Sequence, residues 1–260
     1  FAAGGEDGAS MTAEEFLLRS RRPFHNHAWG RFRGTVQNRA KGGSSKRDIA
    51  VDLLINENFL RAQVVFDPDV VYRVTQAHGA GGLPTLHFEV MPPESRSPLK
   101  ALGLRLEDVT FFVLYWNLVE ELPGETVRGQ ACRVMRLRNP QTFETVKVSF
   151  STEYMAPLRA EFYPPAGGAA TRVMEFTDFE RQGNLWYIKS VRIEGPDWKT
   201  QIKFTDATIA DSQRRPPPHL RPQGKPLRPP RPRPPLLQRL KRRRRPRRLQ
   251  QVPLRGRWLG

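Results

Sequence analysis

The side chains in this sequence most suited to chemistry are its histidines, and their spacing does not give a metal site. The five are His25, His27, His78, His87 and His219. His25 and His27 would share one side of a strand, but no cysteine or carboxylate stands near them at a ligand spacing. Zinc normally takes three or four protein ligands. We therefore expect surface or strand-end histidines, with no metal and no other cofactor.

Three further patterns match catalytic or phosphate-binding motifs only in part. Ser97-Pro98-Leu99-Lys100 fits the S-x-x-K of penicillin-recognising enzymes, but the S-D-N and K-T-G sequences that must accompany it are absent. Glu120 and Glu121 are neighbours at the expected end of a helix and point apart, so they form no acid–base pair. Gly79–Gly82 lacks the lysine of a phosphate loop. We expect a protein that is not an enzyme.

Charge divides the chain into a body and a tail. The formal net charge is +17 over 260 residues, yet residues 211–260 contain 17 of the 43 Lys and Arg residues and 12 of the 24 prolines. Residues 1–210 are therefore nearly neutral and long enough for one sizeable core. We expect a disordered N-terminal remnant (1–10), a globular domain (11–210) and a disordered basic tail (211–260).

Cysteine content and hydropathy bear on the compartment. The only cysteine, Cys132, excludes an internal disulfide. No run of about 18 apolar residues is present, so no transmembrane helix is predicted. The chain begins FAAGGEDGAS, which we interpret as what remains of a precursor whose signal peptide has been removed or is missing.

Alternation of apolar and polar residues predicts β-strands through most of the globular domain. Trp198, Thr200, Ile202 and Phe204 alternate with lysine and glutamine, which is typical of a half-buried antiparallel strand. Five strands are expected before a proline-rich connection and six after it, with short turns such as Asn56–Asn58. Consecutive strands with short connections pair as an antiparallel meander, so a sandwich or barrel is expected.

An N-terminal helix is also predicted. Thr12 and Glu15 form a capping box, Phe16 and Leu17 give the helix an apolar face, and Pro23 ends it.

A fixed order of motifs runs from Asp108 to Phe204. It consists of a helix with the pair Tyr115-Trp116, a Glu121–Gly124 turn, and strands at Gly129–Val134, Val146–Phe150, Pro157–Tyr163 and Gly183–Ile188, then a final W-K-T-Q-I strand. This order resembles the outer-membrane lipoprotein-sorting family, the LolA-like carriers of the bacterial periplasm. The resemblance does not cover the tail.

The resemblance implies a mainly β fold: one curved antiparallel sheet of about 11 strands, forming a half-open, incomplete β-barrel, with short helices covering its concave face. It also implies a monomeric periplasmic carrier that binds the acyl chains of lipoproteins, or another lipid. Its partners would be an inner-membrane releasing complex and an outer-membrane acceptor.

The inward-facing rows of apolar side chains allow two interpretations. Such a face must be covered, either by a packed core or by a ligand in a cavity, and burying a methylene group gains about 0.8 kcal/mol. The resemblance favours the cavity. The residues expected to line it are Phe32, Val36, Val51, Leu53, Val64, Phe66, Tyr72, Leu86, Phe88, Phe112, Tyr115 and Trp116.

The tail supports an alternative function. Lys241–Arg248 could bind an anionic surface or the phosphates of nucleic acid, with the β domain as a scaffold. The tail lacks interleaved aromatic residues apart from Trp258, so we do not expect specific nucleic-acid binding. Its restriction to few residue types is also what an out-of-frame GC-rich reading could give.

Overall fold

The computed structural model describes residues 10–21, 27–66, 70–79, 83–92 and 98–211. All of them belong to one unit, Phe1–Arg221. Several predictions therefore concern residues outside the described part of the chain. These are nearly all of the N-terminal remnant, the basic tail, the helix end at Pro23, the histidines 25 and 219, and Ser97.

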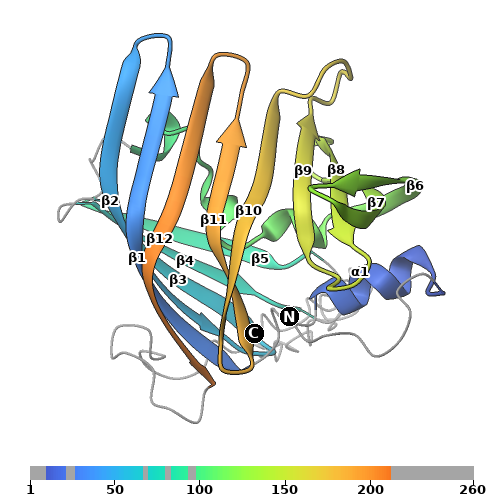
Figure 1. The fold of residues 1–260 in the computed structure, drawn as a ribbon, viewed down its shortest axis with the longest axis horizontal. Helices are drawn as coiled ribbons and strands as arrows, with labels where there is room; N and C mark the ends of the chain where they lie inside the picture. Colours follow the sequence, from blue (N-terminus) through green and yellow to red (C-terminus); the bar gives the residue numbers. More distant parts are fainter. Residues whose placement is uncertain (1–9, 22–26, 67–69, 80–82, 93–97, 212–260) are drawn as a thin grey trace, which may run out of the picture. The chain divides into compact units, whose positions relative to one another are not determined.

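The described unit is built on one antiparallel sheet of twelve strands (Figure 1). From edge to edge they are β5 (Thr85–Met91), β4 (Val70–Ala77), β3 (Phe59–Phe66), β2 (Gly43–Ile55), β1 (Ala28–Ala40), β12 (Trp198–Asp211), β11 (Leu185–Glu194), β10 (Arg172–Gln182), β9 (Pro157–Tyr163), β8 (Thr145–Ser151), β7 (Gln130–Arg138) and β6 (Asn117–Val127). Strands adjacent in sequence are paired except β5 and β6, and the first and last strands meet in the middle. Since β5 and β6 lie at opposite edges, the sheet is open, which confirms the predicted fold class.

Within the described ranges, four short helices accompany the sheet: α1 (Ala13–Arg21), α2 (Pro98–Ala101), α3 (Leu106–Val109) and the 3-10 helix η2 (Phe112–Tyr115). The capping box of α1 is confirmed, because the Glu15 N–H donates to Thr12 Oγ1 at 3.3 Å and the Thr12 N–H donates to Glu15 Oε2 at 3.0 Å. Phe16 is buried as predicted, and its ring meets Phe150 of β8 edge-on at 5.9 Å. Residues of all four helical segments join the core formed by the inward faces of the strands.

The prediction for Asp108–Gly124 was wrong in one respect. Instead of a helix ending in a turn, the segment contains α3 and η2 and then β6, which is the additional strand beyond the eleven expected. The Glu121–Gly124 motif lies inside β6, where the register with β7 shifts between Leu122 and Glu125. A proline cannot donate a ladder hydrogen bond, and an edge strand with a bulge tolerates it.

Alternating burial confirms the predicted inward rows of β3 and β4. It does not confirm those of β2, where Leu54 is more buried than Leu53, or of β5, where Phe88 is exposed. Leu60, Ala62, Val64 and Phe66 of β3 are all buried, and the residues between them are partly exposed. The central ladder joins β1 to β12 from Ala28–Asp211 to Ala40–Trp198 and was not predicted.

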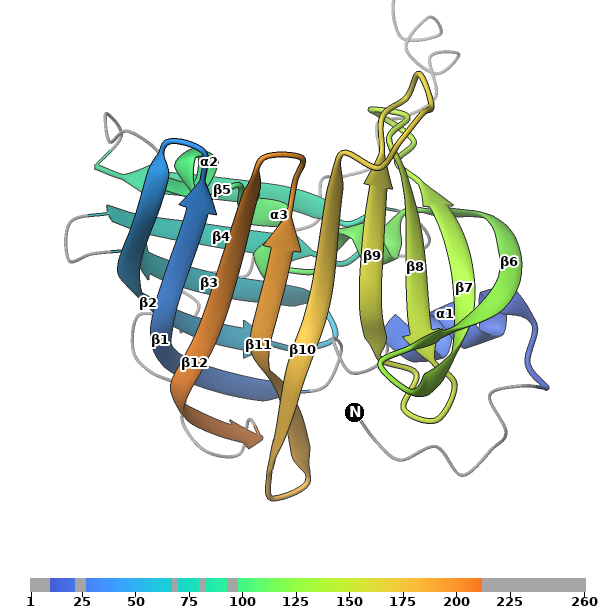
Figure 2. The ribbon, with the colours of Figure 1, turned by 45° about the horizontal axis from the view of Figure 1, so that its top comes forward.

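The hairpin of β10 and β11 leaves the sheet near its tip (Figure 2). Strand β10 pairs with β9 only over Arg172–Glu175, and β11 pairs with β12 only over Ser190–Glu194. From Phe176 to Lys189 the two strands therefore pair only with each other. We call residues 176–189 the splayed tip, and it forms one wall of the site described next.

Candidate apolar binding site

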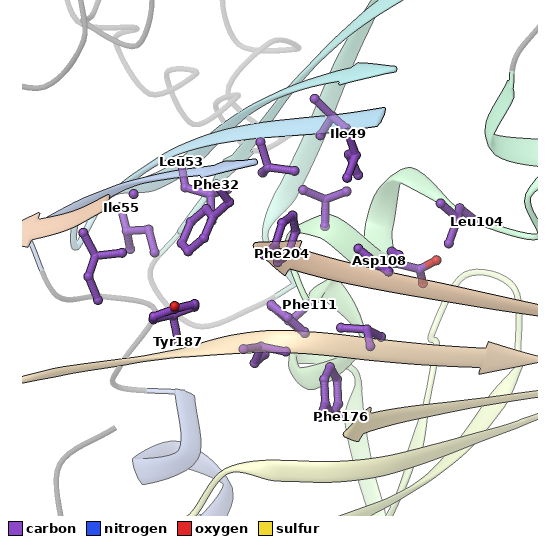
Figure 3. Close-up of a pocket in the computed structure, with 18 of the residues that line it drawn as sticks. Phe32, Ile49, Leu53, Ile55, Leu104, Asp108, Phe111, Phe176, Tyr187 and Phe204 are labelled. Atoms are coloured by element: carbon purple, nitrogen blue, oxygen red, sulfur yellow. The ribbon is translucent and has the colours of Figure 1, made fainter. Parts of the chain in front are cut away.

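A cavity of about 240 Å³ lies between the splayed tip and the inward faces of β1, β2 and β12 (Figure 3). Its main apolar residues are Phe32, Ile49, Val51, Leu53, Ile55, Val64, Phe66, Val109, Phe111, Met174, Phe176, Leu185, Tyr187, Ile188, Val191, Ile193, Ile202, Phe204 and Ile209. These side chains come from six strands and from the α3–η2 segment. The cavity is therefore built by the curvature of the whole sheet and not by any single hairpin.

Aromatic contacts hold the cavity wall together. The ring of Phe32 lies 5.6 Å from that of Tyr187 and 5.4 Å from that of Phe204, measured between centroids. Gly30, two residues before Phe32 on the same face of β1, makes room for this ring. A Cβ atom at Gly30 would lie 2.5 Å from Phe32 Cε2, well inside van der Waals contact.

Phe111 reaches the cavity from a strained backbone position. Its φ of 51° is in the left-handed region, which is unfavourable for a bulky side chain. Phe111 lies at the junction of α3 and η2, and its ring centroid is 5.5 Å from that of Phe176. Such conformations persist where surrounding contacts fix them and often occur at binding sites.

Charged groups are found at one end of the cavity, where Arg105 and Asp108 line it. Asp108 accepts hydrogen bonds from Arg172, which is only 4% exposed, and from the Arg105 backbone N–H at 2.7 Å. The Arg105 guanidinium donates to both carboxylate oxygens of Glu144, at 2.8 and 3.0 Å, and these bonds raise the pKa of Arg105. Each charge is thus matched by an opposite one, and the remaining surface suits uncharged hydrocarbon.

Five of the twelve residues expected to line a cavity do line this one. They are Phe32, Val51, Leu53, Val64 and Phe66. They lie on three neighbouring strands, β1, β2 and β3, where the alternation of apolar residues is regular.

The other seven lie elsewhere. Val36, Tyr72, Tyr115 and Trp116 are buried in the core, with Tyr72 edge-on to Phe66 at 5.9 Å and Tyr115 beside His78 at 5.4 Å. Leu86 and Phe112 are partly buried against the same core. Phe88 is 56% exposed, because β5 is an edge strand.

The C-terminal wall of the cavity was not predicted from the sequence, above all Tyr187, Phe204 and Ile209. The signal was present, since the alternation that ends at Phe204 marks an inward row. What it could not provide was the pairing of β12 with β1, which brings this row beside Phe32 and Val51.

The polar motifs considered first have structural partners. Glu120 is paired with Arg136, and Glu121 forms a bond to Arg133 at 2.6 Å. His87 Nε2 lies 3.8 Å from Glu89 Oε1. Within the described ranges, no cluster of three or more His, Cys, Asp or Glu side chains could hold a metal ion. Among the same residues, no helix has the length and apolar character needed to cross a membrane.

The architecture matches that of solved structures. An outer membrane lipoprotein-sorting protein domain from Vibrio parahaemolyticus superposes with a TM-score of 0.62 at 15% identity, covering 75% of this chain and 91% of that one. A LolA superfamily protein from Nitrosomonas europaea gives 0.53 at 12% identity, covering 78% and 95%. The described unit has the LolA-like fold.

A third similar structure is that of a DUF1329 family protein from Desulfovibrio piger. Its TM-score is 0.58 at 14% identity, with 74% of this chain and 90% of that one covered. No protein-family model matches the sequence, and no curated protein matches it. The likeness is therefore one of fold, as expected at such low identity.

Proposed function

We propose that this chain is a non-catalytic periplasmic carrier that holds the acyl chains of lipoproteins, or of another lipid, in the apolar cavity. The observation that supports this most is the cavity itself, an apolar chamber between a curved sheet and a hairpin tip within a LolA-like fold. The name of the Vibrio parahaemolyticus structure refers to lipoprotein sorting, which agrees with this class of cargo.

The energetics favour capture of hydrocarbon. Burying ten methylene groups gains about 8 kcal/mol before the costs of ordering the ligand are subtracted. A diacyl or triacyl anchor has several times that number, so partial burial is enough for binding. Because the capture is mostly apolar, affinity depends on chain length more than on the identity of the head group.

The cavity is already partly open, and the splayed tip on its border can widen the opening for uptake and release. In the part of the chain that the structure describes, the backbone of residues 176–189 pairs with at most one strand instead of two, and the side chain of Gln182 provides the link to β12. Segments with few partners open locally at a lower free energy than the centre of a sheet. We propose that cargo is taken up and released past this tip, with an inner-membrane releasing complex and an outer-membrane acceptor as partners and the carrier acting as a monomer.

A binding titration tests the proposal. A fluorescently labelled diacyl lipopeptide is titrated with the full chain, and the same peptide without acyl chains serves as the ligand control. Leu53→Glu places a carboxylate in the cavity and is expected to weaken binding at least about 30-fold, since burying an uncompensated charge costs several kcal/mol.

The matched control is Leu18→Glu on α1, because Leu18 is 60% exposed and lies outside the cavity. This variant should bind like the unmodified chain. Equal binding of the acylated and non-acylated peptides would contradict the proposal, and so would equal effects of the two substitutions.

A further inference from the structure

A second cavity, of about 350 Å³, lies where β9 and β10 part. We call it the side groove. It is lined by the turn of the β6–β7 hairpin, the turn of the β8–β9 hairpin and the splayed tip. Two residues, Phe176 and Trp186, line both the side groove and the apolar cavity, so the two spaces share a wall.

The chemistry of the side groove differs from that of the apolar cavity. Five polar residues, Arg128, Gln130, Ser151, Thr177 and Asp178, line it together with six apolar or aromatic residues such as Leu158 and Phe179. An extended peptide, which carries both amide groups and side chains, suits this mixed lining.

One strand edge in the groove is open. Strand β10 has no strand partner on its β9 side after Glu175. The Arg128 side chain occupies the first part of that edge and donates to the carbonyl oxygens of Phe176 and Thr177. Beyond this point, Asp178–Gln182 form backbone pairs only with β11 among the described residues. Asp178 and Phe179 line the groove, and the edge continues past it to Gln182, whose side chain bonds to the backbone of β12. An open edge of this kind can add an extended peptide as a further strand.

Two aromatic residues lie at the border of the groove. Tyr154, in the β8–β9 turn, lies 6.4 Å from Trp186 of β11 between ring centroids. Tyr154 is 38% exposed and Trp186 is 37% exposed. Their faces are available to pack against the side chains of an extended peptide.

We infer that the side groove binds the first residues of the polypeptide that follow the acylated residue of the cargo, as an extended strand along the Asp178–Gln182 edge. The inference rests on the proposed function. A lipoprotein joins hydrocarbon and peptide at one residue, and the structure places an apolar space and a peptide-compatible space on either side of Phe176 and Trp186. One ligand can therefore occupy both.

The test compares ligands on the full chain. The probes are an S-dipalmitoylglyceryl cysteine carrying a six-residue peptide and the same lipid on cysteine amide. The peptide should tighten binding about tenfold, as expected from one or two net main-chain hydrogen bonds. Strand addition uses alternate residues, so N-methylation of one alternate set of peptide nitrogens should abolish the gain and methylation of the other set should preserve it.

Protein variants locate the effect. Tyr154→Ala should lose most of the gain from the peptide while its affinity for the lipid on cysteine amide stays the same. Phe143→Ala removes an exposed aromatic residue that lies outside the groove and should change neither.

Other results would contradict either the inference or the proposed function. Equal affinities for the two probes, or an equal effect of both methylation patterns, would overturn the inference and leave the acyl-binding proposal standing. Light scattering tests whether two copies of the chain associate. If the peptide increases affinity only when they do, the open edge of β10 pairs with a second copy and the inference is overturned. Failure of both probes to bind would contradict the proposed function itself.

Discussion

Phe32 of β1 and Tyr187 of β11 contact each other across the apolar cavity, with ring centroids 5.6 Å apart, although β12 lies between their strands in the sheet. The contact exists because the splayed tip departs from β12 before Ser190 and turns over the concave face. One wall of the cavity is thus a continuous part of the sheet. The other is a hairpin tip whose backbone pairs only within the hairpin among the described residues, and side-chain bonds of Gln182 and Arg128 link it to its surroundings. This asymmetry determines how the cavity can open.

Tyr187→Ala should release bound lipopeptide faster, because it removes the aromatic contact that holds the tip to β1. We expect the dissociation rate, measured by stopped-flow displacement, to rise about three- to tenfold, as the loss of an aromatic pair costs about 0.5–1.5 kcal/mol. Tyr163→Ala on β9 is the control, since Tyr163 lies outside the cavity. Equal rates for the two variants would show that the tip does not control release.

Asp108→Asn should destabilise the fold strongly, because Arg172 is almost fully buried and Asp108 is its ion-pair partner. Removing one partner of a buried ion pair costs about 3–5 kcal/mol in the free energy of unfolding. Asp197→Asn, in the exposed pair with Lys41, is the matched change and should cost less than about 1 kcal/mol. Urea denaturation measures both, and similar losses would contradict this assignment.

Arg128→Ala should loosen the splayed tip without affecting the rest of the sheet. The Arg128 side chain bonds to the carbonyl oxygens of Phe176 and Thr177, where β9 no longer pairs with β10. Amide hydrogen exchange should accelerate in residues 176–189 and remain unchanged in β7 and β8. Arg181→Ala is the control, because Arg181 bonds only within the hairpin turn, and it should leave the exchange of Phe176 and Thr177 as it is.

Acid should weaken the attachment of α1 through Glu121. Its hydrogen bonds with Arg133 lower the pKa of the Glu121 carboxyl, and Arg133 in turn donates to the Met11 carbonyl and lies 4.7 Å from the Phe16 ring centroid. A lowered pKa in the folded state means that the contribution to stability is complete above the unfolded-state pKa of about 4.3 and disappears as the pH falls through the folded-state value.

The Glu121→Gln variant should therefore be less stable than the unmodified chain at pH 7, by no more than about 1 kcal/mol because the pair is partly exposed. The two stabilities should converge as the pH falls below the unfolded-state pKa and through the lowered folded-state pKa of Glu121. Glu57→Gln, in the exposed β2–β3 turn, is the control and should follow the unmodified chain throughout. Parallel stability curves for Glu121→Gln and the unmodified chain would rule out this linkage.

The strands of this fold were predictable where one face of the strand is buried and the other is exposed to solvent. Leu60, Ala62, Val64 and Phe66 alternate without interruption, and their inward placement followed from period-two geometry alone. Strand β6 was not predictable in the same way. Its Pro123-Gly124 pair indicates a turn locally, and only the edge position of the strand permits a bulge there.

The C-terminal half of the cavity lining could not be predicted, because it is formed by strand pairing that a local sequence pattern does not reveal. The inward row that ends at Phe204 was visible, but its position beside Phe32 requires Ala28 and Asp211 to meet across the whole length of the domain. The departure of the splayed tip is set by where pairing stops, at Glu175 and Ser190, and no change in residue type marks these points. Tyr187 therefore looked like an ordinary strand residue.

The most direct test of the central claim is to determine where an acyl chain lies. A diacyl lipopeptide with a photoreactive diazirine in the middle of one acyl chain is bound to the full chain, irradiated, and the modified residues are identified by mass spectrometry. We predict labelling of cavity residues on β1, β2, β11 and β12, such as Leu53, Ile55 and Ile209, that is suppressed by excess unlabelled lipopeptide. Labelling confined to exposed apolar residues such as Leu18, Phe88 and Val119, or labelling that does not respond to competition, would contradict the account.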